Sequence, residues 1–411
     1  MPGKLFLWVA LSVWINGISL GQEKVTYTLE EAIRLALINN PQIKIVEKEI
    51  DSTKGKRLQA FSLAPPELAF TWEGIPSGKS FSQANERTVG IEQNLEFPAK
   101  LFLRKDAATK ELEISYEKLN RTKALVSAEV KKVYYQVNFQ QKLVETLEFT
   151  LGLLKQFQEA TRFKYQSGEL PYFEVIRANV EVAKTQNEII EAKRELLSAK
   201  NNFNLLLGKR GSEDLELKDE LRFTPYLKDE KETLNEYRTK SRTLKITQIM
   251  MEKENKNLKL ANLSFIPDLK LSGGFFSESG EKFIPSFQIG LSLPLWWWNP
   301  KGQIQENRAI FRTAQIKQET ALRVVQSEIE KVYQLVRLSE EQVLLFEKTL
   351  LKEIDEELKA GINSYQYNQV NALGLLDIYR TNKTARIEYY KALLNYLSGL
   401  ADLEVAGEET D

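Results

Sequence analysis

The segment TVGIEQNLEF, residues 88–97, alternates apolar and polar side chains with a period of two. Such alternation predicts a β-strand with one apolar face and one polar face. Its length of about ten residues suits a strand that crosses a membrane, with the apolar face toward lipid and the polar face toward a lumen. The residues expected to face the lumen are Glu92, Asn94 and Glu96.

Three further segments alternate in the same way, near residues 67–73, 268–277 and 283–293. With the strand near 86–97 they predict four strands in the chain. A half-buried sheet in a soluble protein has the same local pattern and is the alternative to a membrane sheet. The glutamates on the polar face favour the membrane sheet, because they suit a water-filled pore.

The tryptophans support the same interpretation. Two of the six lie in an N-terminal apolar run, and the other four lie on or beside predicted strands. Indole rings gather at the boundary between membrane and water, because one end of the ring is apolar and the other donates a hydrogen bond. The predicted interface belt comprises Trp72, Trp296, Trp297 and Trp298.

Residues 1–21 have the features of a cleaved export signal: a short basic start, an apolar run of about 14 residues and small residues before the cleavage point. A buried N-terminal helix is the alternative. After residue 21 no window approaches the roughly 20 apolar residues of a transmembrane helix. The mature chain is therefore expected to be soluble outside the cytoplasm, or to cross a membrane as a closed barrel.

The remaining sequence reads as two copies of one pattern, residues 28–208 and 233–407, joined by a charged, irregular linker at 209–232. Each copy is expected to begin with a helix of about 35 residues. Thr28 and Thr233 are the predicted N-caps, with Glu31 and Glu236 as capping-box partners. Each copy then has two strands, a long helix, a glycine-containing turn (167–169 and 360–362) and a final helix.

The two long helices carry leucines, valines and isoleucines every seven residues. This spacing predicts a coiled coil, because it keeps one narrow apolar seam toward a partner helix. In each copy the two shorter helices together are about as long as the long one, so they are expected to stack end to end beside it. The heptad positions are Leu112, Leu119, Val126, Val133, Gln140, Leu147 and Leu154 in the first copy, and Leu322, Ile329, Val336, Val343 and Leu350 in the second.

Four strands are too few to close a membrane barrel, whose smallest members have about eight. An open sheet edge in lipid leaves backbone amides unpaired, which is very costly. The chain is therefore expected to form a homotrimer. Three copies supply twelve strands, an even number within the known range.

Composition narrows the function. Lys+Arg and Asp+Glu number 57 each, so no net charge attracts nucleic acid. The 411 residues include no histidine and no cysteine, which removes the commonest general base, thiol nucleophiles and the usual zinc ligands. No compact motif indicates an enzyme, and we expect no catalytic residue, no cofactor and no resident metal.

The chain resembles the TolC-like outer membrane efflux proteins over essentially all of the mature sequence. The segment TLEEAIRLALINNPQIKI (28–45) resembles the first-helix signature of that family. Two junctions between strand and long helix are similar to its junctions, IEQNLEFPAKLFLRKDAA (91–108) and GLSLPLWWWNPKGQIQENRA (290–309). Residues 165–208 and 375–404 resemble its hairpin tip and returning helices. The junctions look most like the heavy-metal and cation-efflux branch.

The resemblance implies a mainly α-helical fold with a small β part. In that fold, long helices form a coiled-coil tunnel in the periplasm, and four transmembrane strands per chain close as a trimeric twelve-stranded barrel in the outer membrane. It implies a passive exit duct that works with a periplasmic adaptor and an inner-membrane pump of the RND or ABC type. The duct's other partner is outer-membrane lipid.

The resemblance also implies a constriction at the periplasmic tip, formed by acidic rings. Glu174 occupies the first acidic position in the first copy, and Asp377 the second acidic position in the second copy, where Gly374 replaces the first. About six extra residues after Gly361 disturb the match. The alternative is that both are ordinary carboxylates on a helix surface.

Other functions stay open on the sequence alone. Within the same class, the duct could serve type I protein secretion or drug efflux instead of metal cations. In a different class, the chain would be a soluble periplasmic coiled-coil adaptor or scaffold, with the strands as a sheet domain.

Overall fold

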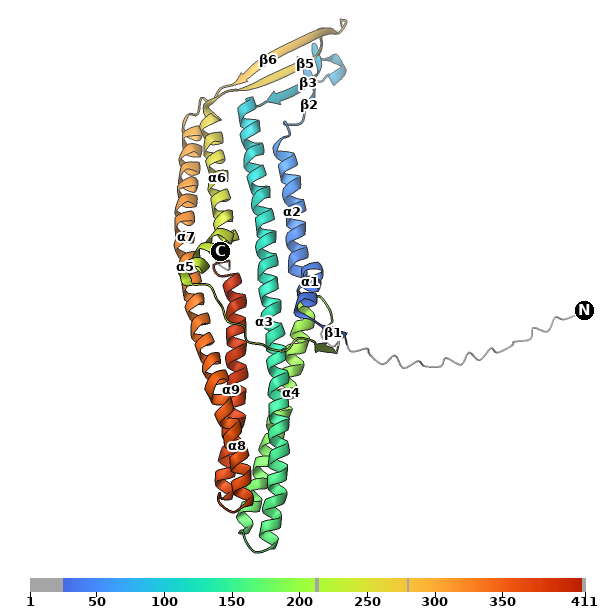
Figure 1. Cartoon of the computed structure of the whole chain (residues 1–411). Helices are drawn as coiled ribbons and strands as arrows, with labels where there is room; N and C mark the ends of the chain where they lie inside the picture. Colours follow the sequence, from blue (N-terminus) through green and yellow to red (C-terminus); the bar gives the residue numbers. More distant parts are fainter. Residues whose placement is uncertain (1–24, 211–213, 279–280, 409–411) are drawn as a thin grey trace, which may run out of the picture.

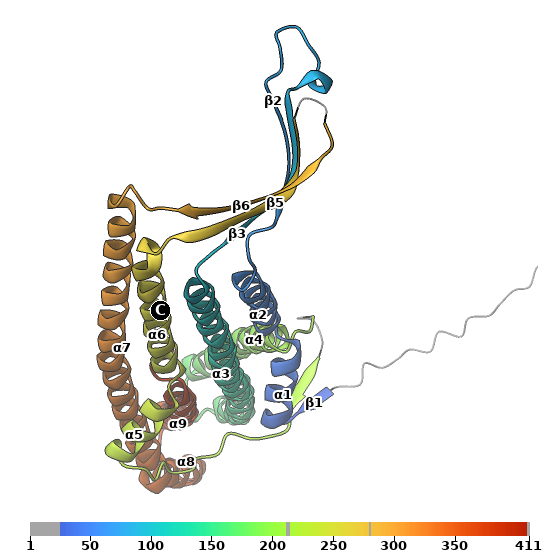
Figure 2. The same cartoon turned by 90° about the horizontal axis from the view of Figure 1, so that it is seen from above.

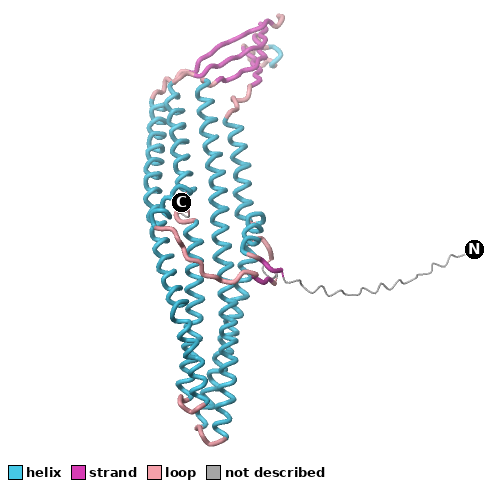
Figure 3. Tube along the Cα trace, in the orientation of Figure 1, coloured by secondary structure: helices cyan, strands magenta, loops and turns pink. Residues whose placement is uncertain are grey.

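The computed structural model describes residues 25–210, 214–278 and 281–408, and the expected export signal at 1–21 lies outside these. Long helices run side by side as a rod with a sheet at one end (Figures 1 and 3). The helices are α1 (Leu29–Asn39), α2 (Pro41–Ala60), α3 (Pro98–Gln166), α4 (Tyr172–Leu206), α5 (Glu230–Lys240), α6 (Arg242–Asn262), α7 (Trp298–Leu345), α8 (Leu351–Gln366) and α9 (Ala372–Glu404).

The strands form two sheets. A short parallel pair at the waist of the rod joins β1 (Val25–Tyr27) to β4 (Leu215–Leu217). The larger sheet is antiparallel, in the order β2-β3-β5-β6. Its strands lie at or near the predicted positions: β2 (Glu67–Glu73), β3 (Glu86–Leu95), β5 (Asp268–Glu278) and β6 (Ile284–Ser292).

The arrangement of helices follows the expected rod. Helix α3 has 69 residues, which makes it about 100 Å long at 1.5 Å per residue. The shorter helices α2 and α4 pack against its two halves, and α6 and α9 pack against the long helix α7 in the second copy. Near the sheet the helices lie side by side in the order α2-α3-α6-α7 (Figure 2), which is also the order of the strands that they join.

Each copy's first helix is broken, which corrects the prediction of single helices of about 35 residues. The break at Asn40 has a local cause, since a residue before proline is driven out of the helical region and Asn40 then caps α2 (Gln42 N to Oδ1, 2.8 Å). In the second copy Ser241 caps α6 in the same way, its Oγ accepting from Leu244 N at 3.3 Å.

The first predicted N-cap is confirmed and the second is wrong. Thr28 and Glu31 form a complete capping box at the start of α1. Asp229, not Thr233, caps the corresponding helix α5, which begins earlier than expected. Thr233 is instead buried within α5, where its hydroxyl donates to the Asp229 carbonyl at 2.7 Å and lies 3.1 Å from the Tyr226 hydroxyl.

The heptad seams are buried through most of their length. Val126, Leu147 and Leu154 are buried in α3, and Ile329, Val336 and Val343 in α7. The two ends of the second seam are exceptions, because Leu322 is 45% exposed and Leu350 is 36% exposed. Helix α7 lies at the outer edge of the helix row, so an apolar stripe there has no helix of the same chain to cover it.

The second hairpin turn is not at Gly361, as predicted, but at Asn368, whose φ of 58° matches the left-handed Gly168 of the first turn. The two turns make corresponding hydrogen bonds, from Gly168 N to the Tyr165 carbonyl (3.0 Å) and from Asn368 N to the Tyr365 carbonyl (3.3 Å). Asparagine tolerates this conformation better than most residues. When the two copies are aligned at these turns, the six extra residues expected after Gly361 are no longer needed. Glu174 then corresponds to Gly374, and Arg177 to Asp377.

Gly361 lies inside α8, where a side chain would collide with Ile378 of α9. It serves close helix packing instead of a turn. One stretch of the second copy is nevertheless one residue longer than its counterpart. The stretch from Val343 to Asn368 has one residue more than the matching stretch from Val144 to Gly168 in the first copy. A π-helical turn at Phe346–Leu350 accommodates this residue, since a π-turn is a one-residue insertion in an α-helix.

In the described part of the linker, residues 214–229 precede α5, and residues 230–232 form the first turn of that helix. From β4 the linker crosses the waist of the rod to α5 (Figures 1 and 3). Asp219 accepts hydrogen bonds from Leu29 N (2.8 Å) and the Tyr134 hydroxyl (3.2 Å), and Glu340 accepts from Tyr226 N (3.0 Å). These bonds join the linker to both copies.

Glu117 connects α3 to α6 and generates a pH-dependent prediction. Burial alone would raise its pKa, but hydrogen bonds from Lys245 and Asn120 and the nearby charges of Lys245 and Arg242 hold the pKa below its usual value. A carboxyl group whose pKa is lower in the folded chain than in the unfolded chain stabilises the fold at pH values above its ordinary pKa. This stabilisation is lost as the pH falls through the pKa that the group has in the folded chain.

Glu117→Gln is therefore expected to destabilise the helical rod by about 1–2 kcal/mol at pH 7, with a smaller loss near pH 3. Thermal melting followed by circular dichroism at both pH values measures this. Glu357→Gln, on the exposed side of α8, is the control. An equal effect of Glu117→Gln at both pH values would contradict the assignment.

Candidate functional site

The four-stranded sheet has one mainly apolar face, interrupted on β3 by Arg87 and Gln93. Residues paired directly across an antiparallel sheet point to the same side, and Leu68, Ile91, Gly273 and Phe287 form one such row. Most of the large side chains on this face are exposed, Phe287 by 70%, whereas Val89, Leu95, Leu269 and Leu271 are half-buried. The large apolar residues of the face are Leu68, Phe70, Trp72, Val89, Ile91, Leu95, Leu269, Leu271, Phe275, Phe287, Ile289 and Leu291.

The opposite face is mostly polar. Glu92 and Asn94 both lie on it, as the alternation of the sequence predicts. Glu92 forms an ion pair with Lys270 on the neighbouring strand, and Asn94 is exposed. A hollow of about 330 Å³ opens on this face between Thr71, Ser272 and Gln288. The third residue predicted for the lumen, Glu96, lies beyond the end of β3 and reaches the first turns of α3 instead.

Glycines allow the sheet to bend at this hollow. A side chain on Gly274 would overlap the Val89 carbonyl and Gly90, and one on Gly90 would come within 3.1 Å of the Gly273 carbonyl. Glycine in a strand is found where backbones approach closely. The strands change direction along their length (Figure 2), so the sheet curves instead of lying flat.

The tryptophans lie toward the two ends of the sheet. Trp72 is near the end of β2 that is far from the helices, stacked on Phe70 with ring centroids 6.2 Å apart. Trp296, Trp297 and Trp298 follow β6 where it joins α7, all more than half exposed. Strands of about ten residues are roughly 33 Å long, which suits an apolar band of about 25 Å when they tilt.

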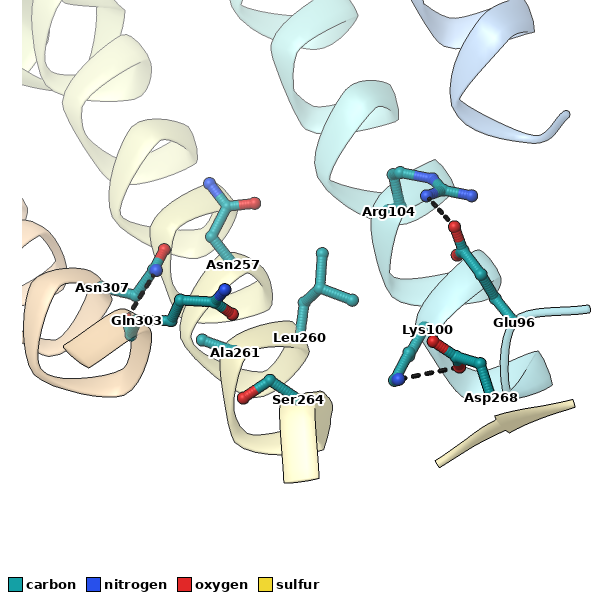
Figure 4. Close-up of a pocket in the computed structure, with 10 residues that line it drawn as sticks. All are labelled: Glu96, Lys100, Arg104, Asn257, Leu260, Ala261, Ser264, Asp268, Gln303 and Asn307. Carbon is teal, nitrogen blue, oxygen red and sulfur yellow. Dashed lines mark hydrogen bonds and ion pairs between the residues drawn. The ribbon is translucent and has the colours of Figure 1, made fainter. Parts of the chain in front are cut away.

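Two basic residues of α3 organise the junction between sheet and helices (Figure 4). The Lys100 ammonium binds Asp268 at the start of β5 (2.8 Å) and the Ile266 carbonyl (2.8 Å). The Arg104 guanidinium binds Glu96 (2.9 Å) and the Ala60 carbonyl at the end of α2 (3.0 Å). Helix α3 therefore contacts both neighbouring connections to the sheet.

A cavity of about 440 Å³ lies beside this network. Asn257, Gln303 and Asn307 line its other wall, on α6 and α7 (Figure 4). Sequence reasoning missed this junction, although the basic residues at 100 and 104 lie one helical turn apart directly after a strand. Their carboxylate partners come from different parts of the chain, so sequence spacing does not reveal the pairs.

At the opposite end of the rod, Glu174 and Asp377 lie in the first two turns of α4 and α9 (Figure 1). Their surroundings differ. Glu174 has a side chain only 13% exposed and pairs with Arg177 on its own helix (3.2 Å). Asp377 is exposed and makes no ion pair among the described residues. The structure does not bring the two carboxylates into contact with each other.

The tip is held by features that the sequence did not reveal. Phe157 of α3 packs against Tyr365 of α8 and Tyr379 of α9, in a core shared by both hairpins. Ion pairs from Arg380 to Glu181 and from Lys383 to Glu188 cross between α9 and α4. Burial raises the pKa of Tyr379 to about 12.

Within the described residues, every helix is either too short or too polar to cross a membrane. The same residues contain no cluster of three side chains suited to hold a metal ion. A strand region with an exposed, mainly apolar face, continued by a long helical rod, is the arrangement that the sequence resemblance predicts for an outer-membrane channel with a periplasmic extension.

Comparison with known proteins agrees with this class. The family model described as outer membrane efflux protein matches residues 32–209. The cobalt-zinc-cadmium resistance protein CzcC of Cupriavidus metallidurans is 22% identical over 89% of this chain and 86% of its own length. The chain is therefore similar to TolC-like outer membrane efflux proteins, through the family model in its first half and through CzcC along most of its length.

Solved structures share the fold. The outer membrane protein VceC of Vibrio cholerae matches 92% of this chain and 94% of its own, with a TM-score of 0.76 and 17% identity. The channel protein CusC matches 92% and 91%, with a TM-score of 0.78 and 16% identity. Together with the family model and CzcC, these likenesses support the assignment of the chain as an outer-membrane efflux channel. Proteins of the matched family are channels that act with periplasmic adaptors and inner-membrane pumps.

The junction generates a prediction. Arg104→Met removes the hydrogen bonds to Glu96 and the Ala60 carbonyl, so the connection at 61–66 is expected to open more readily, by about 1–3 kcal/mol. Limited proteolysis of the folded protein should show several-fold faster cleavage there. Arg308→Met, at an exposed position of α7, is the control. Unchanged cleavage in Arg104→Met would show that the network does not hold this connection.

Proposed function

We propose that three copies of the chain join edge to edge, closing a twelve-stranded barrel in the outer membrane. The support is the sheet itself, whose outer strands β2 and β6 each have one unpaired edge within the chain. Backbone amides exposed to lipid must find hydrogen-bond partners. A head-to-tail ring in which β6 of one copy pairs with β2 of the next satisfies all of them.

The helices next to these strands support the same ring. Helix α2 at one edge and α7 at the other both expose apolar side chains along their length. A soluble rod gains nothing from such stripes, whereas two edges that pack together bury them. The exposed apolar residues are Ile45 and Leu58 on α2 and Ile310, Ile316, Leu322, Val324, Leu335, Leu338 and Leu345 on α7.

The exposed apolar face of the sheet is the single observation that carries the membrane assignment. In the barrel this face contacts outer-membrane lipid, and the polar face with Glu92 and Asn94 lines the lumen. Trp72 lies at the outer boundary of the apolar band, and Trp296, Trp297 and Trp298 at the periplasmic boundary. Glu96 lies just below the barrel, at the entrance to the helical tunnel.

Metal cations are the proposed cargo, because the relative CzcC is a cobalt-zinc-cadmium resistance protein. The duct itself has no histidine or cysteine and only three methionines, so it lacks soft ligands that would retain such ions. Carboxylates and amides along the lumen let hydrated cations pass without tight binding. Selection of the cargo then belongs to the inner-membrane pump, of the RND or ABC type.

The tip is the proposed docking end for the periplasmic adaptor. It exposes aromatic residues, which are enriched in protein interfaces and in their binding hot spots. Phe163 is 70% exposed and Tyr367 is 77% exposed, and Tyr172 and Phe173 extend the same surface.

At this tip the trimer repeats Asp377 and Glu174 three times each. Asp377, which is exposed and unpaired, is the proposed acidic ring that favours cations at the constriction. Glu174 is the weaker member, because Arg177 already neutralises it.

The trimer is tested by purification. In detergent, multi-angle light scattering should give a protein mass three times that of the chain, and gel mobility should change on heating. The protein should stay in the outer membrane through salt and carbonate washes. A freely soluble monomer without detergent would contradict the proposal and favour a periplasmic scaffold.

The gate is tested separately in planar bilayers. Asp377→Asn should lower the cation selectivity of the channel and alter its closing. Glu357→Asn, which removes an exposed carboxylate on α8 further from the tip, should leave both properties unchanged. If Asp377→Asn conducts like the wild type, the acidic ring has no part in selection, although the barrel proposal would stand.

A further inference from the structure

The ends of α3 and α7 nearest the sheet carry basic residues that point in different directions around the helices. Lys100 and Arg104 of α3 lie toward Glu96 and Asp268, which continue the polar face of the sheet. Lys105 is about 140° from Lys100 and about 100° from Arg104 around the helix, and its ammonium group lies over the Phe61 ring. On α7, Lys301 is turned away from Gln303 and Asn307, which line the junction cavity.

The two sides differ in how their charges are neutralised. Lys100 and Arg104 both form ion pairs with carboxylates. Lys105 and Lys301 form none with any described residue. Instead, each ammonium group lies over an aromatic ring: Lys105 is 4.7 Å from the centre of the Phe61 ring, and Lys301 is 5.5 Å from that of Trp297.

Exposed aromatic residues surround both lysines. Phe61 is 46% exposed and lies 6.3 Å from Phe102, which is 57% exposed. Trp297 packs against Trp298 at 6.1 Å, and both are 57% exposed. We define the first group as the Lys105 cluster (Phe61, Phe102 and Lys105) and the second as the Lys301 cluster (Trp296, Trp297, Trp298 and Lys301).

Both clusters lie where the apolar face of the sheet ends and the helices begin. A lysine at this level has apolar rings beneath its stem and a charged end free for a partner outside the protein. Aromatic rings settle at the headgroup level of a membrane, and lysine is attracted there by anionic lipid. A phosphate is the group that meets an uncompensated ammonium at this depth.

We propose that the Lys105 and Lys301 clusters are binding sites for the phosphate headgroups of anionic phospholipids in the periplasmic leaflet. This inference rests on the membrane insertion proposed above. In the head-to-tail ring, the α7 edge of one copy lies beside the α2 edge of the next. The Lys301 cluster of one copy then lies close to the Lys105 cluster of its neighbour, so that one lipid site forms at each subunit boundary.

The basic residues on the lumen side, Lys100 and Arg104, have no such role, because carboxylates of the same chain already neutralise their charges. The difference between the two sides assigns separate tasks to basic residues of one helical turn. Inward residues join the barrel to the tunnel, and outward residues fix the depth of the protein in the membrane and its lipid neighbours.

The experiment is native mass spectrometry of the folded trimer, released from detergent after addition of phosphatidylglycerol or phosphatidylcholine. The wild type should retain phosphatidylglycerol preferentially, and inorganic phosphate in excess should not displace it. Lys105→Gln with Lys301→Gln should lose this retention, by about five-fold for each lysine. Lys105→Arg with Lys301→Arg, which keeps the charge, should restore it.

The matched control is Lys118→Gln with Lys317→Gln, which removes the same charges from the same two helices about 20 Å further from the sheet. Equal retention of the two lipids by the wild type would overturn the inference, even where the glutamine variant fails to fold. Equal losses in the variant and its control would overturn it as well. A wild-type chain that neither trimerises nor enters membranes would instead contradict the proposed function.

Discussion

The requirement that every backbone amide in lipid be hydrogen-bonded governs the assembly that we propose for this chain. Four strands with an exposed apolar face cannot meet that requirement alone, because β2 and β6 each leave an edge unpaired. The order α2-α3-α6-α7 repeats the order of the strands, so the edges of the sheet and the edges of the helix row coincide. In the proposed trimer, a single mode of contact between copies therefore closes both the barrel and the tunnel.

Two copies of one pattern build the rod, and their differences are absorbed locally. The extra residue of the second copy is taken up by the π-turn at Phe346–Leu350, so the hairpin tips still align. Asn368 takes the left-handed position that Gly168 holds in the first copy. The copies differ most in chemistry at the tip, where Arg177 corresponds to Asp377, so one hairpin is self-neutralised and the other presents a free carboxylate.

Near the junction between sheet and helices, basic residues on the polar side and on the apolar side of the sheet have different partners. On the polar side near the junction, each cation has a carboxylate partner from another segment, as Lys100 has in Asp268. On the apolar side, Lys105 and Lys301 lie over aromatic rings and form no ion pair with a described residue. Buried and partly buried charges need partners, whereas charges at a membrane surface meet lipid headgroups. This contrast follows the environment that each side faces.

Local patterns in the sequence determined the element types and much of their extent. The alternation at 88–97, the seven-residue seams, the capping box at Thr28 and the glycine at 168 each depend on neighbours within a few residues, and each predicted its element. The break at Asn40 was also local, since Pro41 marks it. The tertiary structure decided what depends on distant contacts: Thr233 is buried because the linker covers it, Gly361 serves helix packing because α9 lies against it, and Leu322 is exposed because α7 is an edge. The partners of Glu96, Lys100 and Arg104 were likewise settled only when segments far apart in the sequence met, because an ion pair is specified by position in space and not by spacing along the chain.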